Sequence, residues 1–365
     1  MNPLPGSTLA RSSILHLEFI TQKERWQQVF AQLPEFSGKI YYSYAWHAIA
    51  AANGDGRPAA LLFTAGDSGQ AFYPFLIKQI PEAVGGSGEV DLETAYGYGG
   101  PVFFNLNTEQ IGEFKRMMTD WAAKNRVIAE FIRFNPLTPF HTFVDTACQV
   151  SHNRITVSID LTDGPEAVLN GCSEARQRNW KKAGRLGLSI RRLTDPTEFV
   201  PLYAQTMQRL AARSYYHFSR QYFAALAELP KESCFYAGAF TADGRLAAAA
   251  IYLLDQTSAH YHLGASDQQL LHTQANAFLM LEFARLLCGS GRQLLHLGGG
   301  LSLADDDSLF RFKAGFSAQR HDFFIGRHIH DQQKYAQFSQ HWQKLTGLQP
   351  QILLHYHYGA NDENL

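Results

Sequence analysis

Two stretches of the chain repeat the same order of apolar and polar positions. Residues 42–79 and 218–256 each begin near a serine at an expected helix N-cap, Ser43 or Ser219, followed by apolar residues at helical spacing. Two apolar runs come next, joined by the turn sequences TAGDSG and TADG, whose residues tolerate positive φ. Each stretch therefore predicts a helix followed by a β-hairpin.

The agreement continues beyond the hairpins. In each half an aromatic segment with glycines is expected to form a strand, AYGYGGPVFF at 95–104 and AHYHLGA at 259–265. An amphipathic helix should follow, at 109–125 and at 274–289, and each leads into a short strand, VIAEFIRF or QLLHLG. Because five consecutive elements agree, we expect two tandem copies of one α/β unit with a mixed, largely antiparallel sheet.

The remaining segments connect and extend the two copies. Between them, ITVSIDL alternates as a strand does, and DGPEAVLNG begins a helix with proline in its first turn. After the second copy, residues 331–345 are expected to form a helix and 351–358 a strand that could cross back to complete the first sheet. The predicted domains are residues 1–155, with 327–365 as a candidate addition, and residues 156–326.

Composition and charge exclude several classes of protein. Apolar residues make up 45% of the chain, charged residues 18%, and the net charge is −1, which is typical of a globular protein with no average attraction for DNA or anionic lipid. The four cysteines form no CxxC pair, and no apolar run is long enough for a membrane span or signal peptide, so we expect a cytoplasmic protein. No HExxH or similar spacing occurs among the histidines, so no metal site is expected.

A local excess of basic residues lies at 174–192, where seven lysines and arginines stand against one acid, Glu174. On a helix expected at 173–184, several of them recur three or four residues apart, so they share a face that could contact phosphates. These residues are Arg178, Lys181, Lys182 and Arg185. The alternative is a solvated helix end whose cations are favoured by the helix dipole.

Glycines gather where two predicted strands end. They are Gly99 and Gly100 in AYGYGGP, and Gly298, Gly299 and Gly300 in HLGGG. Mixed α/β folds often bind a ligand at such strand ends, where bare backbone allows close approach. A bulge or a tight exit from the strand is the alternative. The aspartates at 305–307 are expected to cap the helix that follows.

The segment SLFRFKAGF (308–316) carries the strongest candidate for catalysis. If it is helical, Leu309, Phe312 and Phe316 face inward and leave Arg311 and Lys313 to flank the buried face. A lysine beside packed aromatic rings lies in a lower effective dielectric, where its charge acts strongly on an oxyanion or a phosphate. A snorkelling surface lysine is the alternative.

Three motifs together, RNWKKAGRLGLSI, YHLGA before a helix and HLGGG followed by DDSLFRFKAGFS, resemble the FemABX-like family. This family is related to the GNAT acetyltransferases, has two such domains, and includes transferases that add amino acids from aminoacyl-tRNA to peptidoglycan precursors. The resemblance covers about residues 40–320 and implies that Lys313 stabilises the carbonyl under attack. It implies phosphate contacts for Arg176, Arg178, Lys181 and Lys182, and a place lining the cleft for Tyr96, Tyr98, Gly99 and Gly100.

Two features depart from familiar patterns. The paired-helix arm that some FemABX-like proteins insert in the second domain is absent, because residues 200–230 have room only for short helices. The R/Q-x-x-G-x-G/A loop with which GNAT enzymes hold the pyrophosphate of acetyl-CoA is also absent, since LLHTQANAFLM and NLNTEQIGEFK stand at the two corresponding positions. Acetyl-CoA held in that usual way is therefore disfavoured.

The sequence thus predicts an acyltransferase with no tightly bound cofactor. The acyl or aminoacyl group would come from aminoacyl-tRNA or acyl-CoA and pass to an amine of a small or lipid-linked cell-envelope precursor, such as a muropeptide, with membrane contact only through that substrate. No GxSxG is present, so direct attack is expected. In this scheme Lys313 stabilises the oxyanion, Arg311 and the basic segment hold phosphates, and Tyr261 or His262 relays a proton. Two alternatives stay open: a CoA-dependent N-acyltransferase acting on an amino sugar or another small amine, and a non-catalytic binding module.

Overall fold

The protein forms one continuous mixed β-sheet with helices on both faces. The computed structural model describes residues 15–33, 36, 38–66, 68–138, 140–144, 146–194, 196–302, 304 and 306–359. Its strands are β1 (Leu15–Ile20), β2 (Arg57–Ala65), β3 (Gly69–Gln79), β4 (Val90–Glu93), β5 (Val102–Phe104), β6 (Val127–Arg133), β7 (Gln149–Asp160), β8 (Ser189–Arg192), β9 (Cys234–Phe240), β10 (Leu246–Leu254), β11 (Ser258–Ser266), β12 (Leu294–Gly299) and β13 (Arg320–Ile329). They lie in the order β1-β2-β3-β4-β6-β13-β7-β12-β11-β10-β9-β8, with β5 paired to β3.

The helices alternate with these strands. They are α1 (Lys23–Gln32), α2 (Tyr44–Ala52), α3 (Thr108–Lys124), α4 (Pro165–Asn170), α5 (Glu174–Arg185), α6 (Phe199–Arg209), α7 (Arg220–Ala227), α8 (Ala275–Leu287), α9 (Ser308–Ala314) and α10 (Gln332–Thr346). The Ser43 and Ser219 side chains accept hydrogen bonds at the starts of α2 and α7, so both predicted N-caps are confirmed. The expected absence of a long paired-helix arm also agrees with the short helices α6 and α7.

The predicted repeat is present in the sheet topology. In the first half, the β2–β3 hairpin leads to β4, which runs parallel to β6 and is joined to it through α3. In the second half, the β9–β10 hairpin leads to β11, which runs parallel to β12 and is joined to it through α8. These two parallel pairs are embedded in an otherwise antiparallel sheet. The expectation of a mixed, largely antiparallel sheet built from two copies of one unit is confirmed.

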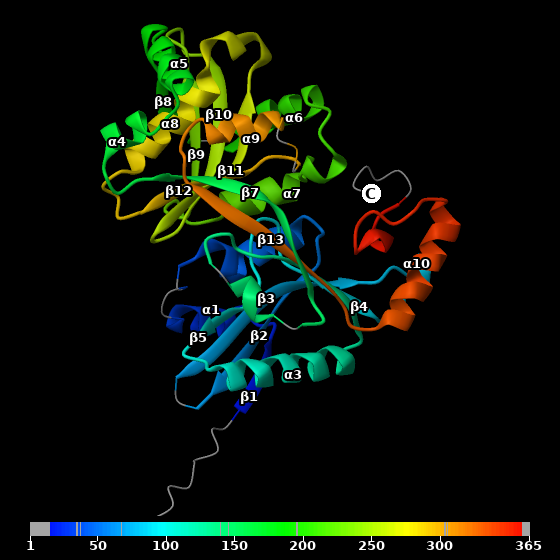
Figure 1. Ribbon diagram of the computed structural model, residues 1–365. Helices are drawn as coiled ribbons and strands as arrows, with labels where there is room; N and C mark the ends of the chain where they lie inside the picture. The colour runs from blue at the N-terminus through cyan, green and yellow to red at the C-terminus, as the bar shows by residue number, and fades with distance from the viewer. Residues whose placement is uncertain are drawn as a thin grey trace, which may run out of the picture.

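The two halves exchange their last strands. β7 follows the first half in sequence but pairs with β12 of the second, whereas β13 follows the second half and pairs with β6 of the first. β7 and β13 also pair with each other, so they form the centre of the sheet between the two halves (Figure 1). The strand that completes the first sheet is therefore 320–329.

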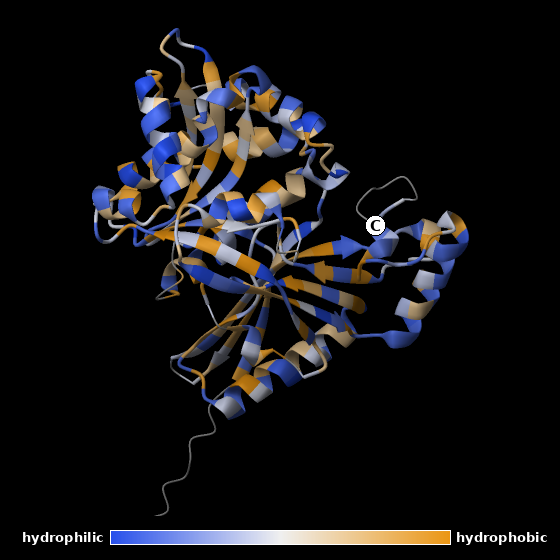
Figure 2. Cartoon of the chain, turned by 45° about the horizontal axis from the view of Figure 1, so that its top comes forward, coloured by the Kyte–Doolittle hydropathy of each residue, from blue (hydrophilic) through white to orange (hydrophobic). Residues whose placement is uncertain are grey.

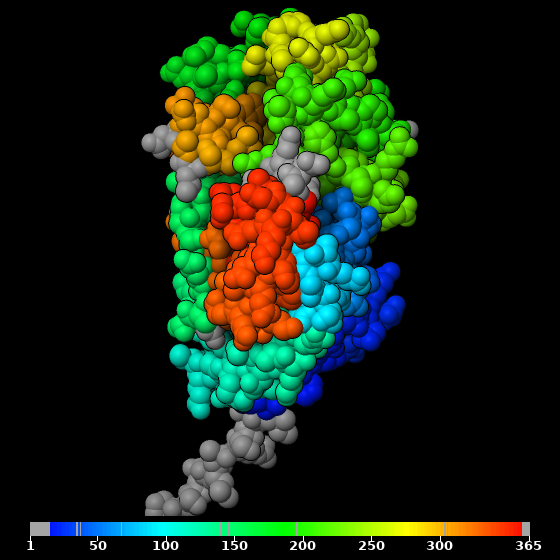
Figure 3. Space-filling view, turned by 90° about the vertical axis from the view of Figure 1, so that its right-hand side faces the viewer, coloured from blue at the N-terminus to red at the C-terminus, as the bar shows by residue number. Residues whose placement is uncertain are grey.

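The C-terminal segment differs from its prediction. The helix expected at 331–345 is confirmed as α10, but 351–358 is not a strand; it contains a 3-10 turn at His355–His357. Its alternating aromatic residues pack instead against the first half, where Tyr356 and His357 hydrogen-bond to the buried carboxylate of Asp91. Figure 3 shows this segment, in red, lying against the light-blue residues of the first half.

The glycine-rich segment 95–104 also differs from its prediction. Only β5 at its end is a strand, and residues 95–101 follow an irregular path. Gly97 and Gly100 have φ of 103° and 89°, a left-handed backbone that a regular strand does not adopt. The aromatic residues favour β-structure, but the positive φ of these two glycines prevents a regular strand over residues 95–101. The corresponding segment 259–265 is a strand, β11, as expected.

Apolar residues gather along the strands and on the inner sides of the helices, while hydrophilic residues cover the outer sides of helices such as α3 and α10 (Figure 2). α8 is an exception, because most of its residues are buried against β9, β10 and β11. The core of the second half thus supports both strands of the parallel pair β11–β12. In the described residues, no helix combines the length and the apolar character that crossing a membrane requires.

Candidate active site

The candidate site lies where the parallel strands β11 and β12 separate. The two strands pair only over Ser258–His260 and Leu294–His296, although β11 continues to Ser266 and β12 to Gly299. Lys313, on α9, lies between their free ends: its Nζ donates a hydrogen bond of 2.8 Å to the Gly299 carbonyl on β12 and stands 5.8 Å from the ring centre of Tyr261 on β11. One cation thus bridges the opening between two strands.

Lys313 is buried rather than exposed at the edge of the helix. Its exposed fraction is 7%, and it is the buried side chain of α9, whereas Leu309 and Phe312 are only half-buried. Phe316 is buried and Phe312 packs partly against the core of the second half, as expected. Lys313, expected to flank this face, is instead buried more deeply than Leu309 and Phe312. The reason is that α9 packs against β12 and β7, which places the lysine towards the strands.

The surroundings of Lys313 hold its pKa at about 7. Burial lowers the pKa most, the charge of Arg154 lowers it further, and Asp307 opposes both effects. Around neutral pH the side chain therefore exists as both ammonium and free amine. Such a strongly perturbed group in a confined place is typical of functional sites.

The glycine and aspartate residues before α9 fix the position of this lysine. One Asp307 oxygen, Oδ1, accepts from the Phe310 N–H at 2.7 Å and caps the helix, as predicted, while Oδ2 accepts from the Leu301 and Ser302 N–H groups at 2.7 and 2.8 Å. A Cβ at Gly300 would lie 2.5 Å from the Asp307 carboxylate, so position 300 must lack a side chain. Asp305 lies outside the described residues.

Gly298 presents bare backbone to the lysine. Its φ is 74°, and a Cβ there would lie 3.4 Å from Lys313 Nζ and 3.5 Å from the Tyr98 hydroxyl. Two polar atoms from different halves of the chain therefore approach one point that has no side chain. The three glycines of HLGGG thus have separate roles: Gly298 provides space, Gly299 provides the carbonyl that accepts from Lys313, and Gly300 makes room for Asp307.

The segment 95–101 of the first half reaches this site through Tyr98. The Tyr98 ring packs edge-on against His296 of β12 and Phe323 of β13, and burial raises its pKa. Gly99 holds the segment in place, because its N–H donates to the Arg133 carbonyl at 2.7 Å. Gly100 packs on Phe134 in the left-handed conformation described above.

Tyr96 and His262 lie together in a different cluster. The His262 ring packs against Trp46 and Tyr96, and its Nε2 lies 2.6 Å from the Tyr222 hydroxyl. Burial lowers the pKa of His262 to about 3, so it stays neutral. These aromatic contacts join the two halves, and they do not bring His262 to Lys313. Of the two predicted proton relays, the structure places only Tyr261 beside the lysine.

Tyr261 is positioned by its own strand. A bulge in the β10–β11 pairing falls at this point, and the tyrosine lies back over the backbone of Gly264, where a Cβ would meet its hydroxyl. Burial raises the pKa of Tyr261 to about 12, so the hydroxyl keeps its proton at neutral pH.

The predicted basic residues separate into two groups. Arg176 is half-buried and joins α5 to α9: its Nη2 donates to the Phe312 carbonyl at 3.2 Å, and its guanidinium lies 4.5 Å from the Phe312 ring centre. Arg178, Lys181 and Lys182 are exposed on the outer side of α5, where Arg178 pairs with Glu174 at 3.2 Å. Arg311 is exposed on α9. Of the predicted basic residues of α5, Arg176 is therefore the one that contacts the helix carrying Lys313.

Sequence reasoning missed Arg154 of β7. Its Nη1 donates to the Gly300 carbonyl, and its charge lowers the pKa of Lys313. The only signal in the sequence was an arginine inside an alternating strand, because its neighbours come from the segment around residue 300.

A second feature without a clear sequence signal is a hollow of about 230 Å³ at the start of α8. It is lined by Gln274, Ala275, Asn276 and Ala277 and bordered by Phe312 of α9.

Comparisons with known proteins agree with this architecture. Residues 174–313 match the family model for the acetyltransferase (GNAT) domain. The crystal structure of FemX aligns with 87% of this chain and 99% of its own, with a TM-score of 0.62 and 12% identity. L-PGS from Bacillus licheniformis aligns over 84% of this chain and 92% of its own, with a TM-score of 0.51 and 10% identity.

A third structure, a conserved protein of unknown function from Bacteroides thetaiotaomicron, covers 86% of this chain and 99% of its own at a TM-score of 0.53 and 9% identity. No curated protein matches the chain in sequence. At such identities the structural likenesses establish the fold. Together with the domain match they support the prediction of an acyltransferase. Residues 174–313, which contain Lys313 and both strands of the opening, are thus the part of the chain that is similar to the acetyltransferase (GNAT) domain.

Proposed function

We propose that the protein transfers an acyl or aminoacyl group from an activated ester to an amine of a cell-envelope precursor, in the opening between β11 and β12. The observation that carries this proposal is the buried Lys313, whose Nζ approaches the bare backbone of Gly298 together with the Tyr98 hydroxyl. A preorganised cation in a poorly solvated place stabilises an oxyanion much more strongly than a solvated one.

The reaction needs no covalent enzyme intermediate. The amine nitrogen attacks the carbonyl carbon of the ester, the carbonyl oxygen becomes an oxyanion beside Lys313, and the carbon–oxygen bond to the leaving alcohol then breaks. The amine loses one proton and the leaving oxygen takes one up, and Tyr261, which is still protonated at neutral pH, can relay it. Positioning and charge stabilisation then supply the rate enhancement.

The donor is proposed to be aminoacyl-tRNA. The resemblance to FemABX-like proteins in sequence and the likeness of the fold to FemX support this choice. The exposed cations Arg178, Lys181 and Lys182 are candidates for contact with phosphates of the donor or of a nucleotide-linked acceptor. The acceptor is proposed to be a small or lipid-linked amine, such as a muropeptide.

An acyl-CoA donor is the second candidate, and the hollow at the start of α8 favours it. The first N–H groups of a helix have no partner within the helix and attract phosphate, and this hollow borders Phe312, the neighbour of Lys313. The segment has no glycine loop, so a CoA would have to be held there by other contacts.

The two donors can be separated by one assay. The protein is incubated with an amine acceptor and either labelled aminoacyl-tRNA or labelled acetyl-CoA, and label in the amide product is counted. We expect label from the tRNA ester, with a loss of about a hundredfold or more in Lys313→Met and no loss in Lys344→Met, an exposed lysine of α10. Label from the thioester alone would replace the proposal with its alternative, and no transfer from either would leave a binding module.

A further inference from the structure

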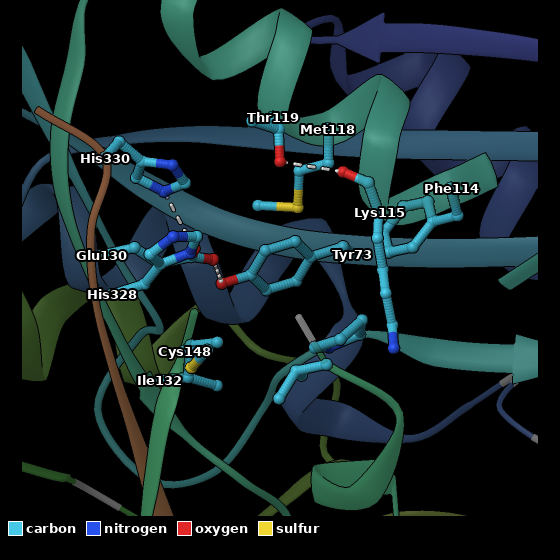
Figure 4. Close-up of a pocket in the computed structure, with 12 residues that line it drawn as sticks. Tyr73, Phe114, Lys115, Met118, Thr119, Glu130, Ile132, Cys148, His328 and His330 are labelled. Carbon is cyan, nitrogen blue, oxygen red and sulfur yellow. Dashed lines mark hydrogen bonds and ion pairs between the residues drawn. The ribbon is translucent and has the colours of Figure 1, made fainter. Parts of the chain in front are cut away.

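A second group of polar side chains lies in the first half, away from Lys313. Glu130 of β6 stands directly opposite His328 of β13. His330 follows the end of β13 by one residue, and its Nε2 also reaches the Glu130 carboxylate. Figure 4 shows the three side chains, here called the Glu130 trio, meeting between the two strands. The trio exists only because β13 leaves the second half and completes the sheet of the first.

The spacing of the trio fits one small cation. Glu130 Oε2 lies 3.2 Å from His330 Nε2 and 3.8 Å from His328 Nδ1, and candidate ligand atoms of all three lie within 4.8 Å of one another. Zinc–ligand bonds of about 2.0–2.1 Å in a tetrahedron place neighbouring ligand atoms about 3.4 Å apart. The observed distances lie around this value, so small side-chain rotations would suffice.

The Glu130 carboxylate is also held in place by a hydrogen bond on the side away from the histidines. Tyr73 of β3 donates a hydrogen bond to Glu130 Oε1, which leaves Oε2 facing the two histidines. Such a partner on the remote oxygen of a ligand is a common feature of metal sites. Figure 4 shows the ammonium end of Lys115 turned away from the trio, so the groups that face Glu130 Oε2 are the two imidazoles.

A small cavity beside the trio has room for an ion. The cavity beside the trio has a volume of about 30 Å³ and is lined by Phe114, Met118, Ile132 and Val144 besides the polar residues. That is enough for an ion with one water. Glu130 and His328 are buried, so an ionised carboxylate here needs a positive partner.

We propose that the Glu130 trio binds one divalent transition-metal ion, with zinc as the ion whose geometry it fits best, and that the fourth position is left to water. Two imidazoles and a carboxylate with an open position are a recurrent zinc ligand set. The bound ion would connect β6 to β13 and so hold the exchanged strand in the first half. The sequence expectation of no metal rested on the absence of a known ligand motif, and here the carboxylate of Glu130 lies 200 residues from His330 in sequence.

Metal content of the whole chain tests this proposal independently of any transferase activity. Protein stripped with a chelator is titrated with Zn²⁺, and in parallel with Co²⁺, whose absorption reports its coordination. We expect one equivalent bound with submicromolar affinity, a loss of at least a hundredfold in Glu130→Gln and His330→Asn, and a loss of about tenfold in Tyr73→Phe. His272→Asn, an exposed histidine near α8, should bind as the unmodified protein does.

Circular dichroism of each variant without metal separates lost folding from lost ligands. If Glu130→Gln fails to fold, Tyr73→Phe and His330→Asn carry the test. The proposal is overturned if no equivalent is bound, if binding persists in both ligand variants, or if only Ca²⁺ or Mg²⁺ binds. In those cases the trio is a buried polar cluster in which the two imidazoles contact the carboxylate.

Discussion

The two halves share one topology, but the half-buried Lys78 of the first half and the buried Lys313 of the second have opposite surroundings. In the first half, Lys78 pairs with Glu93 at 3.0 Å, and Arg133 pairs with the same carboxylate at 2.8 Å, so each cation has an anion and the pKa of Lys78 is raised. In the second half, the bond of Lys313 is to a neutral carbonyl, Arg154 adds a like charge, and the pKa falls to about 7.

We infer from this difference that Lys78 supports the structure of the first half, whereas Lys313 serves the chemistry of the second. Removing one partner of a buried ion pair is costly, so the residues around Glu93 depend on its pairing. A buried cation hydrogen-bonded to a carbonyl gains most when negative charge develops nearby. In the first half, moreover, segment 95–101 follows β4, and its Tyr98 extends to the opening of the second half. We infer that one copy of the repeat supports the site that the other copy forms.

The largest contrast is expected between two lysine-to-methionine variants. Lys313→Met should lose transfer activity by about 10²–10³-fold, yet unfold no more easily at pH 6, because it removes a buried charge held by one carbonyl. Lys78→Met should keep the chemistry but lose about 3 kcal/mol of unfolding free energy, because Glu93 stays buried with one partner fewer. Denaturant titration measures the unfolding free energy of both variants, and single-turnover kinetics measure their transfer rates. Equal effects in the two variants would contradict the proposed difference between the two lysines.

The dependence of transfer activity on pH should report the ionisation of Lys313. With a weakly basic acceptor amine, transfer that needs the Lys313 ammonium should fall above pH 7, by about tenfold per unit. Arg154→Gln removes the like charge, so the midpoint should move up by about one unit. A profile flat from pH 6 to pH 9, under conditions where chemistry is rate-limiting, would show that the ammonium is not required.

The same shift predicts the sign of a stability effect. The unfolded lysine titrates near 10.5 and the folded one near 7, so between these values unfolding takes up a proton. The cost of burying Lys313 is therefore fully present below pH 7 and disappears as the pH rises towards 10.5. The unfolding free energy of the unmodified protein should rise relative to that of Lys313→Met over this range, and a relative fall would contradict the assigned pKa.

A smaller effect is expected from the loop before α9. Gly300→Ala places a Cβ against the Asp307 carboxylate, which must give up its helix cap or its loop N–H groups, at a cost of about 1–2 kcal/mol and about tenfold in activity. Gly112→Ala in α3 is the matched control: its Cβ meets nothing within 4 Å, so helix propensity alone should stabilise the protein by up to about 1 kcal/mol. Thermal unfolding compares the two, and equal shifts would exclude a special role for position 300.

The smallest effect is expected on the outer face of α5. Changing Lys181 and Lys182 to glutamine should leave stability within about 0.5 kcal/mol, because both side chains are exposed. If this face contacts phosphates, the apparent KM for the phosphate-bearing substrate should rise several-fold and depend less on salt. An unchanged KM at low salt would assign the two lysines to solubility.

Local patterns were enough to predict the repeat. The N-cap serines, the turn sequences and the helical spacing of α3 and α8 are all signals within short stretches of sequence, and the structure confirms them. Segments 95–101 and 351–358 were mistaken for strands because their aromatic residues favour β-structure. Glycines with positive φ in the first and contacts with Asp91 in the second override that preference.

The contents of the site were harder to predict. Lys313 could be singled out from its motif, but its burial depends on how α9 packs on β12 and β7. Arg154 and the Glu130 trio depend on the exchange of β7 and β13, which joins residues more than a hundred positions apart. Periodicity carries no signal for such long-range pairings.

The most direct test of the account is the ionisation of Lys313 itself. Titration of the lysine side chains by NMR, with Lys313→Met to assign the signal, should show one lysine with a pKa near 7 that rises when Arg154 is replaced by glutamine. If the signal lost in Lys313→Met titrates instead near 10.5, the usual value for lysine, the ammonium is either solvated or paired, and the proposed role in stabilising an oxyanion is wrong.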